Sequence, residues 1–186
     1  MKALIVYATR YGATAGTSEE IAKVLREEGL DVEIVNAKEK TINDISEYGL
    51  IVVGGGMQMT RWTGETEDFL KKFQKELVQK KVALFVSSAM KSVYEREGKK
   101  EELEKLKVFL EDKAAKYALH PIALGLFGGI LDYDKMGFIF RRALVSLKAR
   151  FEAAGFKESK PGLIDTRDWD EIRNWARQLA LKSRWL

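Results

Sequence analysis

Cysteine is absent from this sequence of 186 residues, which also contains only one histidine and two prolines. Without cysteine, the chain has no disulfide framework, no cysteine-ligated zinc site and no thiol nucleophile. The single histidine, His120, excludes a metal site built from several histidines. We therefore predict no metal site and no catalytic side chain, and we expect a bound cofactor to carry any redox chemistry.

Long apolar runs are absent as well. None approaches the roughly 18 residues that a membrane-spanning helix needs. Met1–Tyr7 enters an apolar, strand-like segment at once, without the features of a signal peptide. Hydrophobic residues make up 46% and charged residues 32% of the chain, which is typical of a folded domain. These features predict a single cytoplasmic domain over residues 1–186.

Basic residues are concentrated in one segment of the second half. The net charge is +4, and Lys135–Arg150 contains no acidic residue. Its cations are Lys135, Arg141, Arg142, Lys148 and Arg150. The segment predicts a basic amphipathic helical insertion around 132–152, with a surface suited to an anionic membrane or an acidic protein. Packing inside an enlarged domain or a homodimer is an equally good explanation, and this local patch does not predict nucleic-acid binding.

Five short apolar segments predict the strands of a parallel sheet, because such segments alternate here with amphipathic helices. The predicted strands are 3–8, 32–35, 50–53, 82–86 and 121–127. An α/β fold of this type has the strand order 2-1-3-4-5 and binds its ligand at the carboxyl edge of the strands. The expected ligand-binding loops are therefore 9–17, 54–65 and 87–95.

Apolar residues at helical spacing predict the helices that cover the sheet. The first helix is expected to begin at Thr17, which would form a capping box with Glu20, and to end at Gly29. The other predicted helices are 41–48, 69–77, 95–119, 135–151 and a last one that begins at the capping pair Asp168 and Glu171.

The loop after the first strand has the composition of an anion-binding site. Small and hydroxylic residues run from Thr9 to Ser18, between a buried strand and a helix N-terminus, where main-chain amides and the helix dipole favour an anion. A P-loop is excluded because Thr17 rather than lysine follows Gly16, and the spacing of Gly12 and Gly16 does not match a dinucleotide-binding fingerprint. A phosphoacceptor receiver domain would need acidic residues at the ends of strands one and three, and they are absent.

Thr9, Gly12 and Thr14 match the pattern Thr/Ser-x-x-Gly-x-Thr, and with this motif the chain resembles the flavodoxin family over about residues 1–130 and the last helix. The resemblance implies a flavodoxin-like three-layer sandwich that binds flavin mononucleotide (FMN). It assigns the FMN phosphate to Thr9, Arg10, Tyr11, Gly12, Ala13 and Thr14. The Arg10 side chain fits a position in water as well as a position on the phosphate. Three extra residues, 15–17, separate this motif from the predicted helix.

The resemblance also assigns the second and third loops to the flavin ring. Glycines after the third strand allow the main chain to approach the ring edge, and in flavodoxins a peptide of this loop moves to hydrogen-bond the reduced ring. The expected ring neighbours are Gly55, Gly56, Met57, Gln58, Met59, Trp62, Ser87, Ser88 and Ala89. For Trp62, a half-buried structural role is a nearly equal alternative.

Two later segments, Gly128–Tyr133 and Asp165–Trp169, are similar to the flavodoxin-like, menaquinone-dependent protoporphyrinogen oxidases. The flavodoxin resemblance implies an electron-transfer protein with a redox partner protein, whose FMN cycles between oxidised, semiquinone and hydroquinone states. The second resemblance implies an FMN-dependent oxidase that passes electrons to a membrane quinone. A flavin-free interaction module that uses the basic segment is a third hypothesis.

Overall fold

The computed structural model describes residues 1–57, 61–133, 135 and 141–185, with only the main chain described for 141–144. Within these ranges, no helix is both long enough and apolar enough to cross a membrane.

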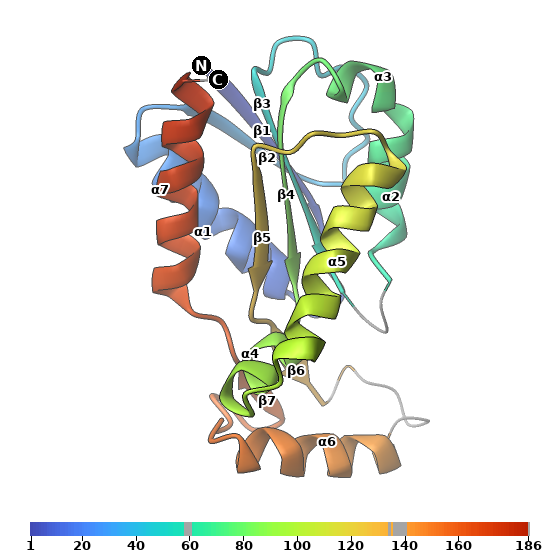
Figure 1. Cartoon of the computed structure of the whole chain (residues 1–186), viewed down its shortest axis with the longest axis vertical. Helices are drawn as coiled ribbons and strands as arrows, with labels where there is room; N and C mark the ends of the chain where they lie inside the picture. The colour runs from blue at the N-terminus through green and yellow to red at the C-terminus, as the bar shows by residue number, and fades with distance from the viewer. Residues whose placement is uncertain (58–60, 134, 136–140, 186) are drawn as a thin grey trace.

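Five parallel strands form the central sheet of the molecule (Figure 1). They are β1 (Lys2–Ala8), β2 (Asp31–Asn36), β3 (Leu50–Gly56), β4 (Lys81–Ser87) and β5 (Ala123–Phe127). Their order in the sheet is β2-β1-β3-β4-β5, which confirms the predicted flavodoxin-like α/β fold. β3 is longer than predicted, because Gly54, Gly55 and Gly56 pair with β4 as strand residues.

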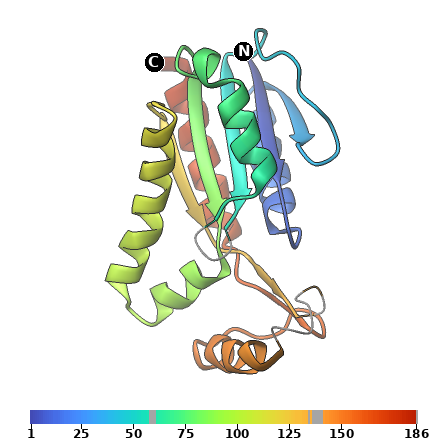
Figure 2. The ribbon, with the colours of Figure 1, turned by 90° about the vertical axis from the view of Figure 1, so that its right-hand side faces the viewer.

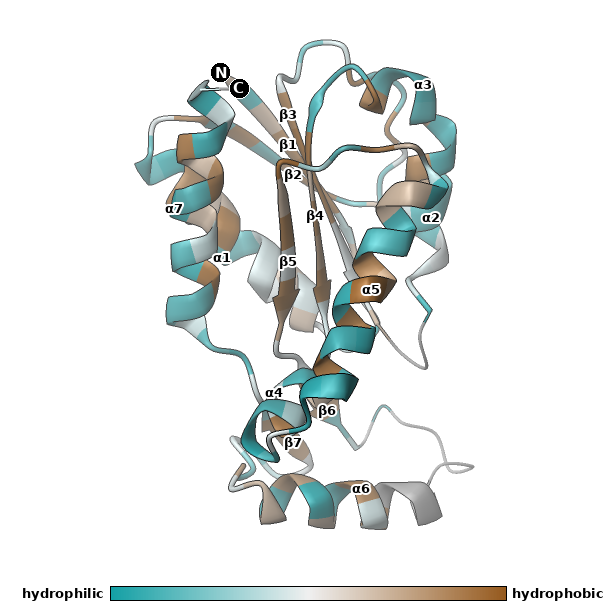
Figure 3. Ribbon diagram, in the orientation of Figure 1, coloured by the Kyte–Doolittle hydropathy of each residue, from teal (hydrophilic) through white to brown (hydrophobic). Residues whose placement is uncertain are grey.

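Helices cover both faces of this sheet. α1 (Ala13–Glu27) and α7 (Trp169–Trp185) lie on one face, and α2 (Gly64–Lys72), α3 (Gln74–Leu77) and α5 (Lys100–Lys116) lie on the other. Alternate strand residues supply two separate cores: Ile5 and Val52 pack with α1 and α7, and Leu4 and Val53 pack with α2, α3 and α5. The strands in the middle of the sheet are accordingly largely apolar (Figure 3).

A smaller unit lies beyond the carboxyl edge of the sheet (Figure 2). It contains β6 (Ile130–Asp132), α6 (Arg141–Ala153) and β7 (Leu163–Asp165), and β6 and β7 pair antiparallel. Phe151 and Ile164 are fully buried in its core, which also includes Val93 of α4 (Ala89–Arg96). The sequence predicted an insertion helix here but not the two short strands.

Polar contacts fasten this unit to α4 and its C-terminal end. Arg150 forms a bidentate ion pair with Glu97, at 2.8 and 2.6 Å, and Arg96 donates to the carbonyl of Ala154 at 2.8 Å. The Arg96 guanidinium also lies 3.5 Å from the centre of the Phe156 ring. Ion pairing to Arg150 and Lys99 holds the pKa of the Glu97 carboxyl at about 2, so these contacts persist at neutral pH.

Several predicted helix boundaries are wrong. α1 begins at Ala13, so Thr17 lies inside the helix and forms no capping box. Residues 41–48 form no helix, and the predicted 69–77 helix is interrupted at Phe73. Of the predicted 95–119 helix, Lys100–Lys116 form α5. α4 lies before it, mostly within the predicted 87–95 loop, and a turn in which Gly98 has φ 67° separates the two helices.

The capping prediction at the last helix is correct in part. The Asp168 carboxylate accepts hydrogen bonds from the amides of Asp170 and Glu171, as an N-cap does. The Glu171 carboxylate does not return to Asp168 but pairs with Lys91 at 2.7 and 2.8 Å. Of the predicted 135–151 helix, residues 141–151 are helical, and 136–140 lie outside the described residues.

Candidate functional site

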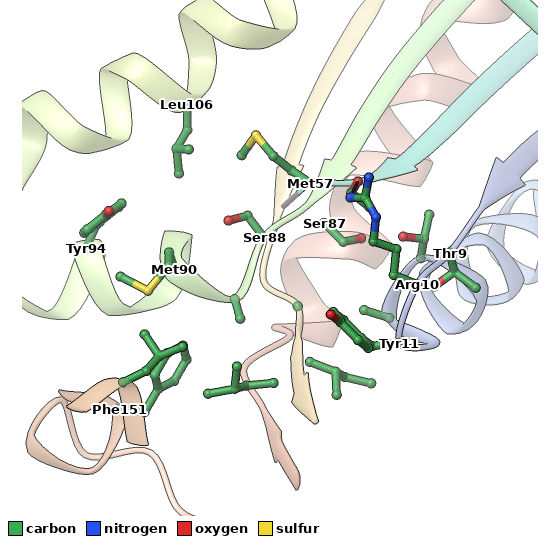
Figure 4. A pocket seen from close by; sticks show the side chains of 18 residues that line it. Thr9, Arg10, Tyr11, Met57, Ser87, Ser88, Met90, Tyr94, Leu106 and Phe151 are labelled. Atoms are coloured by element: carbon green, nitrogen blue, oxygen red, sulfur yellow. Dashed lines mark hydrogen bonds between the residues drawn. The ribbon is translucent and has the colours of Figure 1, made fainter. Parts of the chain in front are cut away.

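A cavity of about 410 Å³ opens at the carboxyl edge of the sheet, where the fold predicts a ligand (Figure 4). The loops after β1, β3 and β4 form one end of it, and α4, α5, β6 and α6 form the other. Its volume lies in the range of small-molecule and cofactor sites. The lining residues are Thr9, Arg10, Tyr11, Ala13, Thr14, Gly56, Met57, Ser87, Ser88, Ala89, Met90, Tyr94, Leu106, Gly129, Ile130, Leu131, Leu147 and Phe151.

The loop after β1 turns directly into a helix. Gly12 has φ 90°, a left-handed conformation that favours glycine, and its amide donates to Thr9 Oγ1 at 2.9 Å. α1 begins at the next residue, and none of the described side chains caps it. The first amides of a helix have no acceptor within the helix. The positive end of α1 is therefore available to an anion at the edge of the cavity.

Two hydroxyls of the cavity wall are also available for hydrogen bonding. Thr14 is 1% exposed and Ser87 is 5% exposed, yet neither hydroxyl has a hydrogen-bond partner in the described part of the chain. Buried hydroxyls normally have partners, because an unpaired buried polar group costs free energy. The first turn of α1, Ala13–Gly16, contains no acidic residue that would repel an anion. The residues present thus fit a phosphate group.

The second loop passes close to the first at Gly56. A Cβ atom on Gly56 would lie 3.4 Å from Thr14 Oγ1, in ordinary contact, so a larger side chain there would point toward the proposed phosphate-binding end. A Cβ on Gly55 would lie 3.0 Å from the indole of Trp62. Trp62 is 4% exposed and belongs to the core on the α2, α3 and α5 side of the sheet. The second loop therefore presents Gly56 and Met57 to the cavity.

The guanidinium of Arg10 crosses from the first loop to the second. Nη1 donates to the carbonyl oxygens of Gly56 at 3.2 Å and Arg61 at 3.3 Å, and Nη2 donates to that of Trp62 at 3.2 Å. The sequence left phosphate and water open as the surroundings of Arg10, and the structure adds these three carbonyls, which neither alternative included. The contacts join positions that are 46 to 52 residues apart, so sequence spacing could not indicate them.

Arg167 lies against the start of α1. The sequence did not indicate that Arg167 is a neighbour of this site. Arg167 forms a bidentate ion pair with Asp165, at 2.9 and 2.5 Å, and Nη1 donates to the carbonyl of Ala13 at 3.4 Å. A Cβ on Gly16 would lie 2.5 Å from that Nη1 atom. Residues 15–17, which the motif did not explain, are thus the first turns of α1, and Gly16 makes room for Arg167.

The far end of the cavity is apolar. Leu106 comes from α5 and Met90 and Tyr94 from α4, and β6 and α6 add the rest of this wall. Leu147 and Phe151 are four residues apart in α6, a helical spacing that places both on one face of that helix, and this spacing is the signal the sequence offers for them. Nothing in the sequence placed that face against the ligand-binding loops, because the contact depends on how the smaller unit packs on α4.

Ten of the predicted site residues line the cavity together: Thr9, Arg10, Tyr11, Ala13, Thr14, Gly56, Met57, Ser87, Ser88 and Ala89. Three do not line it. Gly12 supports the turn behind the first loop, Gly55 lies within β3, and Trp62 packs in the core instead of beside the expected ring. Gln58 and Met59 lie outside the described residues.

The parallel sheet, with an anion-binding helix start after β1 and a cavity at the β1–β3 switch point, defines a flavodoxin-like α/β protein. The family model described as "Flavodoxin domain" matches residues 4–153, and the chain belongs to this family.

Known proteins with the same fold share little sequence identity with this chain. A flavodoxin from the domain Archaea is 14% identical with a TM-score of 0.57, and the match covers 99% of each chain. Oxidised flavodoxin 1 from Bacillus cereus is 17% identical with a TM-score of 0.50, over 82% of this chain and 98% of that one. The quinone-dependent protoporphyrinogen IX dehydrogenase of Escherichia coli strain K12 is 22% identical over 184 residues, which is 97% of this chain and 95% of that protein.

Proposed function

We propose that this protein binds FMN in the cavity at the carboxyl edge and transfers electrons through it. The observation that carries the proposal is the Thr14 hydroxyl, which is buried without a described partner in the first turn of α1 and beside Gly56. A phosphate there would satisfy this hydroxyl and the helix amides together. Membership of the flavodoxin domain family supports the same ligand.

The chain's own residues divide the work of holding such a cofactor. Thr14 and the first amides of α1 hold the phosphate, and Gly56, Met57, Ser87 and Ser88 border the ring. The apolar far end excludes water from the ring. Bound FMN supplies one- and two-electron redox chemistry that these side chains lack. We propose that the protein is an electron carrier that uses the three redox states of the flavin.

A second candidate is an FMN-dependent oxidase that passes electrons to a membrane quinone. The 22% identity to the Escherichia coli dehydrogenase extends over 97% of this chain. Leu147 and Phe151 of α6 add an apolar wall next to the ligand-binding loops, which an apolar reaction partner would contact. Both candidates would use the same phosphate-binding end, and the carrier remains the first candidate because the family match is to a flavodoxin domain.

An absorption spectrum of the freshly purified protein, with and without added FMN, tests the proposed cofactor. We expect a bound-flavin spectrum, and a protein that stays colourless after FMN is added would contradict the proposal. Stepwise anaerobic reduction with dithionite then separates the candidates. A stable one-electron state favours the carrier, whereas turnover of protoporphyrinogen with menaquinone favours the oxidase.

The partners of this protein are also proposals. A carrier needs a redox partner protein, and Lys135–Arg150 is the segment we propose for contact with an acidic protein or an anionic membrane surface. Several of its cations pair within the chain: Lys135 with Asp132 at 3.2 Å, Lys148 with Glu158 at 2.6 Å and Arg150 with Glu97 at 2.6 Å. Arg141 and Arg142 are two adjacent cations of the same segment, and we choose them for the test of that proposal. A homodimer through the same helix is the alternative.

A further inference from the structure

The position of Arg10 suggests a role that the phosphate motif does not assign. Arg10 is half-buried in the wall of the cavity, next to Thr9 in the first loop. Figure 4 shows its guanidinium directed toward the second loop, beside Met57. All the hydrogen-bond acceptors that the structure describes for it are main-chain carbonyls: those of Gly56, Arg61 and Trp62.

These carbonyls lie on both sides of one short segment. Gly56 is the last residue of β3, and Arg61 and Trp62 lead into α2. One guanidinium therefore ties together the two ends of the second loop. The charge of Arg10 strengthens each of these hydrogen bonds, and its planar guanidinium holds several acceptors in fixed directions. Arg10 therefore restricts the positions of the two loop ends. Within the described part of the chain, all three carbonyls accept their side-chain hydrogen bonds from Arg10.

These hydrogen bonds of Arg10 affect the part of the cavity that we assign to the flavin ring. Gly56 and Met57 are the described residues through which the second loop borders the cavity. The Met57 amide is already fixed by a hydrogen bond to the carbonyl of Ser87 at 3.1 Å, so the β4 side of this border is set by the sheet. On the opposite side, Arg10 donates to the carbonyls of Arg61 and Trp62, and the Trp62 ring also packs in the core.

We propose that Arg10 is a positioning residue for the part of the cavity that receives the flavin ring, and not a ligand of the phosphate. This inference rests on the proposed function, because it assumes that a flavin occupies the cavity. The two roles have different consequences for flavin affinity. Loss of a phosphate ligand weakens the binding of phosphorylated flavin only, whereas loss of a ring-positioning residue weakens the binding of every flavin with the same ring.

The test compares FMN with riboflavin, which has the same ring and ribityl chain but no phosphate. Dissociation constants for both are measured by flavin fluorescence on the apoprotein of the wild type, Arg10→Gln and Arg10→Lys. The Lys variant keeps the charge but not the planar, multiple donor. Arg61→Gln is the matched control, since it removes an exposed cation of the same loop while keeping the carbonyl that Arg10 uses.

We expect both Arg10 variants to raise the dissociation constants of FMN and riboflavin by the same factor. The factor is about tenfold if the variant loses the equivalent of one charge-assisted hydrogen bond. The control is expected to bind both flavins as the wild type does. A loss for FMN alone, with Arg10→Lys close to the wild type, would identify Arg10 as a phosphate ligand and overturn the proposal. Unchanged affinity for both flavins would overturn it too.

A second readout needs no flavin. Amide hydrogen exchange of the apoprotein is expected to become faster at Arg61 and Trp62 in both Arg10 variants, and to stay unchanged in β1 and β4. Equal exchange rates at Arg61 and Trp62 in the wild type and in both variants would contradict the inference that Arg10 holds the second loop. If the wild-type apoprotein binds neither flavin, the proposed function fails, and exchange still reports whether Arg10 holds the loop.

Discussion

Three residues at and beside the start of α1 determine which chemical group fits this end of the cavity. Thr14 Oγ1 is buried without a described partner, Gly12 supplies the left-handed turn, and Gly56 leaves the space beside the hydroxyl. Each feature would be unfavourable or unnecessary in a loop that served only to begin a helix. Together they fit the phosphate of the proposed cofactor.

Replacing Thr14 by aspartate is expected to abolish FMN binding. Two like charges about 4 Å apart repel by about 4 kcal/mol near a protein surface, which corresponds to roughly a thousandfold in the dissociation constant. Thr14→Ser, which keeps the hydroxyl, is the control and should bind nearly as the wild type does. The measurement is flavin retention after desalting, and an Asp variant with wild-type stoichiometry would show that the phosphate lies elsewhere.

At the next level of organisation, one helix and two short strands complete the cavity. α6, β6 and β7 pack around Phe151, which is fully buried and also lines the cavity. Burial raises the pKa of Tyr133, which follows β6, to about 12, so that side chain stays neutral at physiological pH. The smaller unit thus has its own core, and that core is continuous with the apolar end of the site.

Phe151→Ala is expected to loosen this unit more than the sheet. Removing a buried phenylalanine ring costs about 3–5 kcal/mol, and the lost contacts belong to the unit's core. Amide exchange should therefore become faster in β6 and β7 while β1, β3 and β4 stay protected, and flavin binding should weaken. Val145→Ala, at a position of the same helix that is 73% exposed, is the control and should change stability by less than about 0.5 kcal/mol. Equal loss of protection in the central sheet would argue against a separate unit.

For the protein as a whole, ligand binding and folding are linked, because a cofactor that binds only the folded state stabilises it. FMN at a hundred times its dissociation constant should raise the free energy of unfolding by about 2.7 kcal/mol. For a chain of this length, that corresponds to a rise of roughly 5–10 °C in Tm. Differential scanning calorimetry measures it, with Thr14→Asp as the control. A wild-type Tm that FMN leaves unchanged would contradict binding.

The charge of the molecule predicts a second global property, its affinity for anionic surfaces. Arg141→Glu combined with Arg142→Glu should leave FMN bound but reduce cosedimentation with anionic lipid vesicles by roughly tenfold or more, because each basic residue contributes about 1 kcal/mol. Lys23→Glu combined with Lys38→Glu makes the same change of charge at exposed positions elsewhere. Equal sedimentation of the two double variants would rule out a specific role for the basic segment.

Local pattern was enough to indicate the strands and the helices that cover the sheet. The strands are short apolar runs and the helices have apolar residues about 3.6 positions apart, so neighbouring residues carry these signals. The strand order was expected from the alternation of five such strands with helices, and it is confirmed. Trp62 was misplaced as a ring neighbour because the glycines before it continue β3, and its ring packs over Gly55 toward the core. Whether a loop tryptophan points inward or outward depends on that pairing.

Only the folded arrangement brought Arg10 to the carbonyls of the second loop, Arg167 to the start of α1, and Phe151 to the far wall of the cavity. Each of these contacts joins segments that lie tens of residues apart, and no local period or propensity encodes such a distance. The amino-acid order thus sufficed for the frame, and the place of the anion stays a prediction from the sequence. The walls that would enclose a ring were decided by long-range packing.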